Sequence, residues 1–255
     1  MSARDVGVVI PAGGSGRRMG GLRKQYLELA GEPVLLRALR PFLEHPSVAA
    51  VVIALPADDA ALPPEWLRDV DERVRLVAGG AERADSVRRA LEQVPETIRR
   101  VLVHDAARPL VTRQVIDRTL AAVAEGQGAI AAVRIADTVK EVDAQGGIVA
   151  TRDRSRLWRA QTPQAFPRDL LVAAYRAAAE EGMGATDDAA LVERIGGRVV
   201  VVDGDVANLK VTTPADVAIA EALLTRGSHQ TTGAPAAGGA GSAGSAGAAR
   251  PAREV

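Results

Sequence analysis

The chain has 255 residues, no formal net charge at pH 7 and a hydrophobic fraction of 47%, which is ordinary for a globular protein. The balanced charge argues against a non-specific binder of nucleic acid or of anionic membranes, and the lack of cysteine excludes disulfides, thiolate metal sites and cysteine nucleophiles. No apolar run approaches the roughly 20 residues that span a bilayer, and the N-terminal apolar run is too short for a signal-peptide core. We therefore expect a cytoplasmic protein.

Short β-branched runs alternate along the chain with longer segments that carry apolar residues at helical spacing. Buried strands are predicted at Val6–Ile10, Val48–Ala54, Val74–Val77, Val101–His104, Ala129–Val133 and Val199–Val202. Helices are predicted at Pro33–Leu43, Ala84–Gln93, Thr112–Ala124, Pro167–Glu181, Asp187–Ile195 and Pro214–Leu224. Because apolar strands separated by helices need cover on both faces, the pattern predicts an α/β fold with a mainly parallel sheet between two helical layers.

Two segments break the alternation. Thr138–Val142 and Ile148–Thr151 flank a glycine-bearing turn, which predicts a β-hairpin. A lone two-stranded hairpin is marginal in water, so it should pack on something, either a partner subunit or its own domain. From Gly227 onward the chain is rich in Gly, Ala, Ser and Pro, which predicts a disordered tail over 227–255 behind a single domain over 1–226.

A glycine cluster follows the first predicted strand. Ala12-Gly13-Gly14-Ser15-Gly16 can turn sharply and present backbone N–H groups to an anion. Position 19 is Met19 where a dinucleotide fingerprint needs glycine, and no lysine is followed by Ser or Thr as in a P-loop. A bare cluster could equally be a solubilising turn. A polyphosphate cradle is favoured by the nearby cations Arg17, Arg18, Arg23 and Lys24.

Asp105 follows the apolar run Val101-Leu102-Val103-His104, so it should lie at the carboxyl end of a strand, where such sheets bind ligands. A carboxylate there can hold Mg²⁺, which bridges and neutralises phosphate oxygens; capping a turn is the alternative. We expect His104 to be structural and not a base. With three histidines and no cysteine, the composition argues against a tight zinc site.

Three further stretches are ambiguous from their residues alone. Gly79–Val87 is typical of a glycine-rich turn followed by capping residues. Thr186-Asp187-Asp188 is typical of a helix N-cap followed by first-turn acids. Lys210 precedes the last helix and ordinarily would be a solvated lysine, but only three of the 32 basic residues are lysines. That scarcity favours a specific role for its compact charge.

Together the motifs resemble those of the 2-C-methyl-D-erythritol 4-phosphate cytidylyltransferase family. They are Pro-Ala-Gly-Gly-x-Gly-x-Arg-Met from 11, Lys-Gln-Tyr from 24, Gly-Gly-x-Glu-Arg-x-x-Ser-Val from 79, His-Asp-Ala-Ala-Arg-Pro from 104, Thr-Pro-Gln from 162 and Asn-x-Lys-Val-Thr from 208. The resemblance runs from Val6 to Leu224 and implies a Rossmann-like sheet. It also implies a reaction that joins CTP to methylerythritol phosphate with release of pyrophosphate, in the non-mevalonate route to isoprenoids, with Mg²⁺ as cofactor.

The same resemblance assigns nucleotide and catalytic residues. It implies that Arg18 and Lys24 stabilise the transition state, that Asp105 binds Mg²⁺ and that Lys210 reaches phosphate. The CTP phosphates would be cradled by Ala12, Gly13, Gly14 and Gly16. The cytosine and ribose would face Gly80 and Ser86, with Ala106 beside the nucleotide.

It also assigns an acceptor site and a partner. The residues that would hold methylerythritol phosphate are Arg108, Thr138, Arg154, Thr162 and Lys210, with Thr186 close by. The hairpin arm, about 137–157, would cross to a second subunit of a homodimer. The chain departs from the family at Gly13, usually alanine, at Arg23, usually proline, and at Ala207, often acidic. The last departure leaves Asp203 and Asp205 as candidates for a second carboxylate.

Two alternatives stay open at this point. One is a cytidylyltransferase for another polyol phosphate such as ribitol 5-phosphate, and the other is a non-catalytic nucleotide-binding protein on the same sheet. Thr138, Arg154 and the Thr-Pro-Gln stretch favour methylerythritol phosphate as acceptor. The joint presence of Arg18, Lys24 and Asp105 favours an enzyme, because binding alone needs fewer placed charges.

Overall fold

A seven-stranded sheet forms the centre of the computed structural model, which describes residues 4–14, 23–182, 184 and 186–230. Its order is β11-β7-β10-β6-β1-β4-β5. The strands are β1 (Val6–Pro11), β4 (Val48–Leu55), β5 (Val74–Ala78), β6 (Arg100–Val103), β7 (Gln127–Arg134), β10 (Trp158–Pro167) and β11 (Arg198–Asp203). Only β10 is antiparallel to its neighbours β6 and β7, so the predicted mainly parallel sheet is confirmed.

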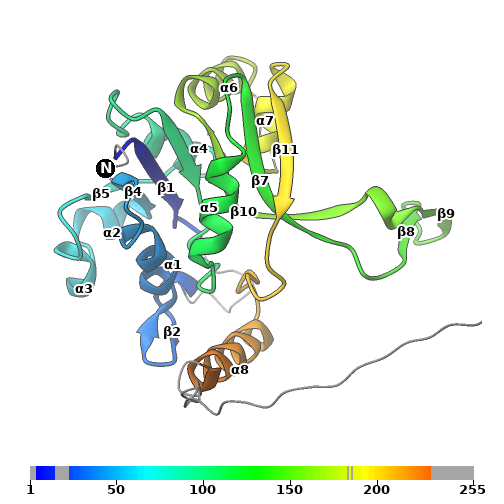
Figure 1. Ribbon diagram of the computed structural model, residues 1–255, viewed down its shortest axis with the longest axis horizontal. Coiled ribbons are helices and arrows are strands. Elements are labelled where there is room, and N and C mark those ends of the chain that lie inside the picture. The colour runs from blue at the N-terminus through cyan, green and yellow to red at the C-terminus, as the bar shows by residue number, and fades with distance from the viewer. Residues whose placement is uncertain (1–3, 15–22, 183, 185, 231–255) are drawn as a thin grey trace, which may run out of the picture.

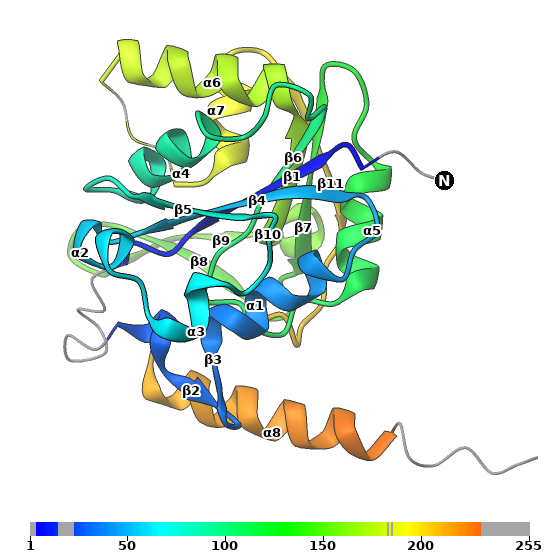
Figure 2. The ribbon, with the colours of Figure 1, turned by 90° about the vertical axis from the view of Figure 1, so that its left-hand side faces the viewer.

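Helices cover both faces of this sheet, as predicted (Figures 1 and 2). The covering helices are α1 (Val34–Leu43), α2 (Ala57–Ala61), α3 (Glu65–Arg68), α4 (Arg83–Leu91), α5 (Arg113–Ala121), α6 (Arg168–Glu180) and α7 (Asp188–Arg194), whereas α8 (Pro214–Gln230) lies apart from the sheet. One buried cluster joins the sheet to α1 and α5. A second joins its other face to α4, α6 and α7. The alternating apolar strand residues divide between these two cores, which is why a few β-branched runs suffice to specify the layers.

The prediction that Val74–Val77 and Val199–Val202 are buried strands is wrong in one respect. Both segments are strands, but β5 and β11 are the two edges of the sheet. Their valines are half-buried or exposed, and Val201 is 45% exposed. An edge strand has a neighbour on one side only, so apolar composition alone does not guarantee burial.

Strand β10 was not predicted, although residues 161–166 are all buried in the middle of the sheet. Its buried stretch contains the polar residues Gln161, Thr162 and Gln164, which break the apolar run expected of a central strand, and Pro163, which central strands disfavour. The β10–β7 register shifts between Ala160 and Gln164, and the Thr162–Pro163 peptide bond is cis. Polar groups of this strand serve the candidate site, as described below.

A small lobe forms beside the sheet. The short pair β2 (Glu28–Leu29) and β3 (Glu32–Pro33) was not predicted. Leu29 of β2 and Ala220 of α8 share a buried cluster with Val34, the first residue of α1, and Val211. The turn η2 (Lys24–Tyr26) leads into this lobe. Helix α8 continues to Gln230, past the predicted end at 224 and into the start of the predicted tail. Residues 231–255 lie outside the described part of the chain, so the tail stays a prediction.

The predicted hairpin is present as β8 (Val139–Val142) and β9 (Ile148–Arg152), followed by the short turn η3 (Arg154–Arg156). It stands well away from the sheet (Figure 1). Val142, Ile148 and Val149 are 55, 66 and 64% exposed on it. Across the described ranges of the chain, no helix combines the length and apolarity needed to cross a membrane.

Candidate active site

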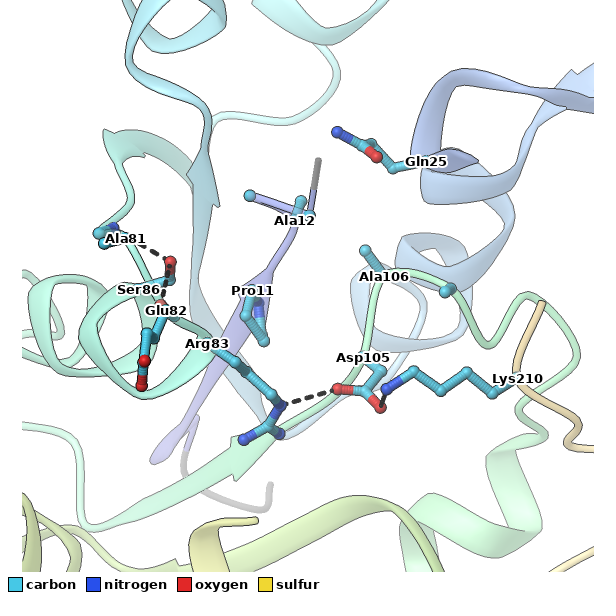
Figure 3. Close-up of a pocket in the computed structure, with 14 residues that line it drawn as sticks. Pro11, Ala12, Gln25, Ala81, Glu82, Arg83, Ser86, Asp105, Ala106 and Lys210 are labelled. Atoms are coloured by element: carbon cyan, nitrogen blue, oxygen red, sulfur yellow. Dashed lines mark hydrogen bonds and ion pairs between the residues drawn. The ribbon is translucent and has the colours of Figure 1, made fainter. Parts of the chain in front are cut away.

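A cavity of about 340 Å³ opens beyond the carboxyl ends of β1 and β6, beside the N-terminus of α4 (Figure 3). This is the edge at which parallel sheets bind ligands. It is lined by Pro11, Ala12, Gly13, Gly14, Gln25, Gly80, Ala81, Glu82, Arg83, Ser86, Asp105, Ala106, Ala107 and Lys210. The structure thus brings together all the predicted nucleotide-binding residues except Gly16, which lies outside the described residues.

The loop before α4 is packed too closely for side chains at its glycines. A Cβ added to Gly80 would lie 2.1 Å from the Cβ of Asp85, and one added to Gly79 would lie 2.7 Å from Ser86 Oγ. The Gly80 N–H donates to Ser86 Oγ at 3.1 Å, and Ser86 Oγ donates to the Glu82 carbonyl at 3.0 Å. Glu82 and Asp85 also form a capping box on α4. These bonds fix one wall of the cavity.

The departure at Gly13 is structurally mild. A Cβ at this position would meet only Ser86 Oγ within 4 Å, at 3.4 Å, which is an ordinary contact distance. The alanine that is usual in the family would therefore fit here without moving the wall.

Three cationic side chains surround the carboxylate of Asp105 in the cavity. Its Oδ1 accepts from Arg83 Nε at 3.1 Å, its Oδ2 accepts from Lys210 Nζ at 2.8 Å, and Arg108 Nε lies 3.7 Å from Oδ2. Burial alone would raise the pKa of Asp105, but the charges of Arg83, Lys210 and Arg108 hold it well below its usual value. Asp105 is therefore ionised throughout the physiological range.

Arg83 is a site residue that the sequence reasoning missed. Its Nη1 and Nη2 donate to the two oxygens of Asp188 at 3.1 and 2.8 Å, while its Nε reaches Asp105. Asp188 is fully buried and also accepts from Tyr175 Oη at 2.5 Å. Burial lowers the pKa of Arg83, but Asp188 and Asp105 more than offset this and raise it. A cation in the first turn of a helix, where the macrodipole disfavours it, was the available signal.

The expected N-cap at Thr186 is wrong by one residue. Asp187 caps α7, because its Oδ1 accepts from the Ala190 N–H at 3.0 Å. Thr186 is exposed and does not line the cavity. With the cap at Asp187, Asp188 is the first residue of α7. Its buried carboxylate accepts hydrogen bonds from Arg83.

Strand β10 holds the loop that carries Lys210 against the strand end that carries Asp105. Gln161 Nε2 donates to the Asp205 carbonyl at 2.8 Å, and Asn208 Nδ2 donates to the Thr162 carbonyl at 2.8 Å. Arg108 Nη1 donates to the Asn208 carbonyl, also at 2.8 Å. The polar residues in the centre of the sheet thus satisfy backbone groups of the loop before Lys210.

The hydroxyl of Thr162 bridges His104 and Asp105, the two residues that follow β6. Thr162 Oγ1 accepts from the Asp105 N–H at 3.0 Å and lies 3.0 Å from His104 Nδ1. His104 Nε2 faces the Arg108 carbonyl at 3.1 Å, and burial lowers the pKa of His104 to about 4. Because a carbonyl only accepts, Nε2 carries the proton of the neutral ring, and Thr162 donates to Nδ1. His104 therefore has the structural place expected of it.

The predicted acceptor residues are divided. Thr162 and Arg108 lie behind Asp105, where the Thr162 hydroxyl and Arg108 Nη1 are hydrogen-bonded as described, and neither residue lines the cavity. Thr138 and Arg154 are exposed on the hairpin arm, where Arg154 Nη1 donates to the Ala136 carbonyl. Within one chain the arm does not bring these two residues to the cavity (Figure 1).

The side chains of the two predicted catalytic residues, Arg18 and Lys24, are not among those that the structure describes. Arg18 lies outside the described residues, and so does the side chain of Lys24. The neighbour of Lys24, Gln25, is buried and lines the cavity, so η2 does border it. Arg23, which stands where the family usually has proline, pairs with Asp59.

Among the described residues that line the cavity, the one carboxylate besides that of Asp105 is that of Glu82, which is exposed and belongs to the capping box of α4. Neither Asp203 nor Asp205 lines the cavity, and Asp205 Oδ1 accepts from the Ala207 N–H at 2.8 Å. Among the described residues, no three His, Cys, Asp or Glu side chains gather as a metal site. A single ionised carboxylate fits Mg²⁺ of the kind that keeps several waters and substrate phosphates as its other ligands.

Comparisons with known proteins agree with this geometry. The model of the family "2-C-methyl-D-erythritol 4-phosphate cytidylyltransferase" matches residues 6–226. A protein of that name from Symbiobacterium thermophilum is 50% identical over 88% of this chain and 95% of its own length. One from Syntrophus aciditrophicus is 43% identical over 86% of this chain and 95% of its own length.

Solved structures give the same result. The crystal structure of 4-diphosphocytidyl-2C-methyl-D-erythritol synthase from Anaerococcus prevotii superposes with a TM-score of 0.78 at 30% identity, covering 87% of this chain and 96% of that one. The crystal structure of 2-C-methyl-D-erythritol 4-phosphate cytidylyltransferase from Thermus thermophilus has a TM-score of 0.73 at 34% identity, covering 87% and 99%. The chain therefore belongs to the 2-C-methyl-D-erythritol 4-phosphate cytidylyltransferase family, which confirms the resemblance carried by its motifs and makes it a cytidylyltransferase.

Proposed function

We propose that the chain transfers the cytidylyl group of CTP to 2-C-methyl-D-erythritol 4-phosphate by direct in-line attack of the acceptor phosphate on the α-phosphorus. The products are 4-diphosphocytidyl-2-C-methyl-D-erythritol and pyrophosphate. The observation that carries the proposal is the cavity at the sheet edge, in which ionised Asp105 lies among Arg83, Lys210 and Arg108 beside closely packed glycines. Such a site suits polyphosphate and has no cysteine or histidine among its described lining residues.

The chemistry needs little else from the protein. An acceptor phosphate is already a nucleophile, so the barrier lies in bringing polyanions together and in stabilising the charge that spreads in the transition state. We assign this task to Arg18 and Lys24. The backbone of Ala12, Gly13, Gly14 and Gly16 would hold the CTP phosphates.

The remaining nucleotide contacts follow from the cavity walls. Gly80, whose N–H donates to Ser86 of α4, would face the cytosine and ribose together with Ser86, and Ala106 would lie beside them. Lys210 is 36% exposed and would exchange Asp105 for a phosphate oxygen. Asp105 would hold Mg²⁺, which when bound neutralises phosphate charge.

The acceptor side of the site involves a second subunit. We propose a homodimer in which the arm over 137–157 brings Thr138 and Arg154 to the partner's cavity, where they and Lys210 hold the acceptor beside Arg108, Thr162 and Thr186. Three exposed apolar side chains on an arm that stands away from its own sheet support this role. Because the reaction consumes CTP, we place the enzyme in the cytoplasm.

The experiment is pyrophosphate release with components omitted one at a time. Release is expected only when CTP, methylerythritol phosphate and Mg²⁺ are all present. Faster release with ribitol 5-phosphate would refute the acceptor assignment, and no release with any polyol phosphate would refute catalysis. Release that is unchanged in EDTA would refute the metal assignment.

The shared site has its own test, using mixed dimers of K24A and R154A subunits. One of the two cavities in such a dimer has an intact Lys24 and receives an intact arm, so activity should return although each parent is impaired. Failure of the mixture to exceed its parents would refute the crossing. The matched control is K140A, because Lys140 is a cation on the same arm that bonds Thr151 within the hairpin; it should leave activity unchanged.

A further inference from the structure

The two oxygens of Asp105 have partners of different kinds. Oδ1 accepts from Arg83 Nε at 3.1 Å, and Oδ2 accepts from Lys210 Nζ at 2.8 Å (Figure 3). The side chain of Lys210 is 36% exposed and lies on a loop, whereas that of Arg83 is 26% exposed and rises from the first turn of α4. Arg108 Nε also lies 3.7 Å from Oδ2, which is beyond hydrogen-bond distance. The hydrogen-bond partner of Oδ2, Lys210, is therefore easily exchanged, whereas that of Oδ1, Arg83, is not.

Arg83 is fixed from outside the cavity. Its two terminal nitrogens bind both oxygens of Asp188, a bidentate geometry that fixes the plane of the guanidinium. Asp188 is 0% exposed and accepts a further bond from Tyr175 Oη at 2.5 Å. If Arg83 swung to a phosphate, a fully buried carboxylate would lose its counter-charge, which is strongly unfavourable.

We propose that Arg83 is a positioning residue and not a phosphate ligand, and that Asp188 and Tyr175 anchor it. Arg83 keeps hold of Oδ1 while Lys210 leaves for the nucleotide, so that Oδ2 becomes the oxygen available to Mg²⁺. Neither Asp188 nor Tyr175 lines the cavity. This inference rests on the proposed function, because it takes Asp105 as the metal ligand.

The test is calorimetric titration of the full-length enzyme with CTP, with Mg²⁺ and with EDTA, in the absence of acceptor so that nothing turns over. Wild-type enzyme should bind CTP more tightly with Mg²⁺. In D188N this Mg²⁺-dependent gain should fall by about tenfold or more, the range seen for groups that orient metal ligands. Y175F should reduce it by a smaller factor. CTP affinity in EDTA should change less than about twofold in both variants. In a separate turnover assay with acceptor present, kcat should fall by a larger factor than the KM for CTP rises.

The matched control is D71N. Asp71 holds Arg73 through both of its oxygens in a bidentate pair remote from the cavity, so its loss mimics the removal of an Arg–Asp pair without touching Asp105. D71N should keep the full Mg²⁺-dependent gain. Its effect on thermal stability sets the baseline against which stability losses in D188N and Y175F are judged.

The inference is overturned if folded D188N and Y175F keep the wild-type gain. It is also overturned if they lose CTP affinity equally with Mg²⁺ and with EDTA, because Arg83 would then bind phosphate directly. Should D188N fail to fold, Y175F decides alone, since it removes one hydroxyl and keeps the ring. A wild-type enzyme without any Mg²⁺-dependent gain would instead refute the metal assignment on which the inference rests, while pyrophosphate release would still report on the transferase.

Discussion

Replacing Thr162 by valine separates a structural role from an acceptor-binding role. Thr162 is 4% exposed, and its hydroxyl serves both the Asp105 N–H and His104 Nδ1, each at 3.0 Å. Valine has the same shape but leaves these two buried groups without a partner. Each such group costs about 1–3 kcal/mol, and the gain from the added methyl is about 0.8 kcal/mol. The expected loss of stability is about 3 kcal/mol, or roughly 6–12 °C in Tm for a domain of this size.

The assay is thermal and urea unfolding with two companion variants. T162S keeps the hydroxyl and should lose much less. T119V removes another buried hydroxyl, which donates to the Val115 carbonyl inside α5 at 2.7 Å. Because this hydroxyl accepts from no N–H of the described residues, its removal leaves no buried donor without a partner, and the stability of T119V should be nearly that of the wild type. A T162V enzyme as stable as T119V would refute the bridging role. A rise in the KM for acceptor without loss of stability would then favour direct acceptor binding.

Three further predictions concern charge, packing and pH. K24A should lower turnover far more than CTP affinity, and equal losses would make Lys24 a binding residue. G128A should cost about 1–3 kcal/mol in urea unfolding, because the new Cβ would lie 2.2 Å from Phe166 Cδ1, whereas G13A should be neutral; equal stabilities would refute the packing argument. Because burial holds the pKa of His104 at about 4 in the folded state, against about 6.5 in the unfolded chain, stability should be full above pH 6.5 and fall by up to about 3 kcal/mol towards pH 4. An H104Q variant that keeps the same slope over this interval would contradict that assignment.

Much of the fold follows from local pattern. The strands that end at Pro11, Leu55 and Val103 are short apolar runs beside helices with one apolar face, and these alone specify a layered, mainly parallel sheet. Position at the edge of the sheet is a different matter. Strands β5 and β11 read like central strands because the sequence records apolar content and not the number of neighbours.

The sequence predicted residues that the cavity brings together, and it missed the contacts that the residues of the site make with one another. The glycines, Asp105 and Lys210 stand in motifs that state their chemistry, and the cavity gathers them. The Arg83–Asp188 pair joins residues 105 positions apart, and Gln161 bonds a loop 44 positions away. No local pattern encodes such pairings. The buried amides of β10 look like loop residues until the backbone groups they satisfy are known.

The fate of the acceptor's phosphate oxygen tests the central claim most directly. With ¹⁸O in the phosphate of methylerythritol phosphate, direct attack on the α-phosphorus predicts ¹⁸O in the bridging position of the diphosphate product and none in pyrophosphate, as read by ³¹P NMR. It also predicts that CTP and Mg²⁺ without acceptor leave no nucleotide bonded to the protein. An unlabelled bridging oxygen, or a covalent cytidylyl-enzyme formed from CTP alone, would contradict the account.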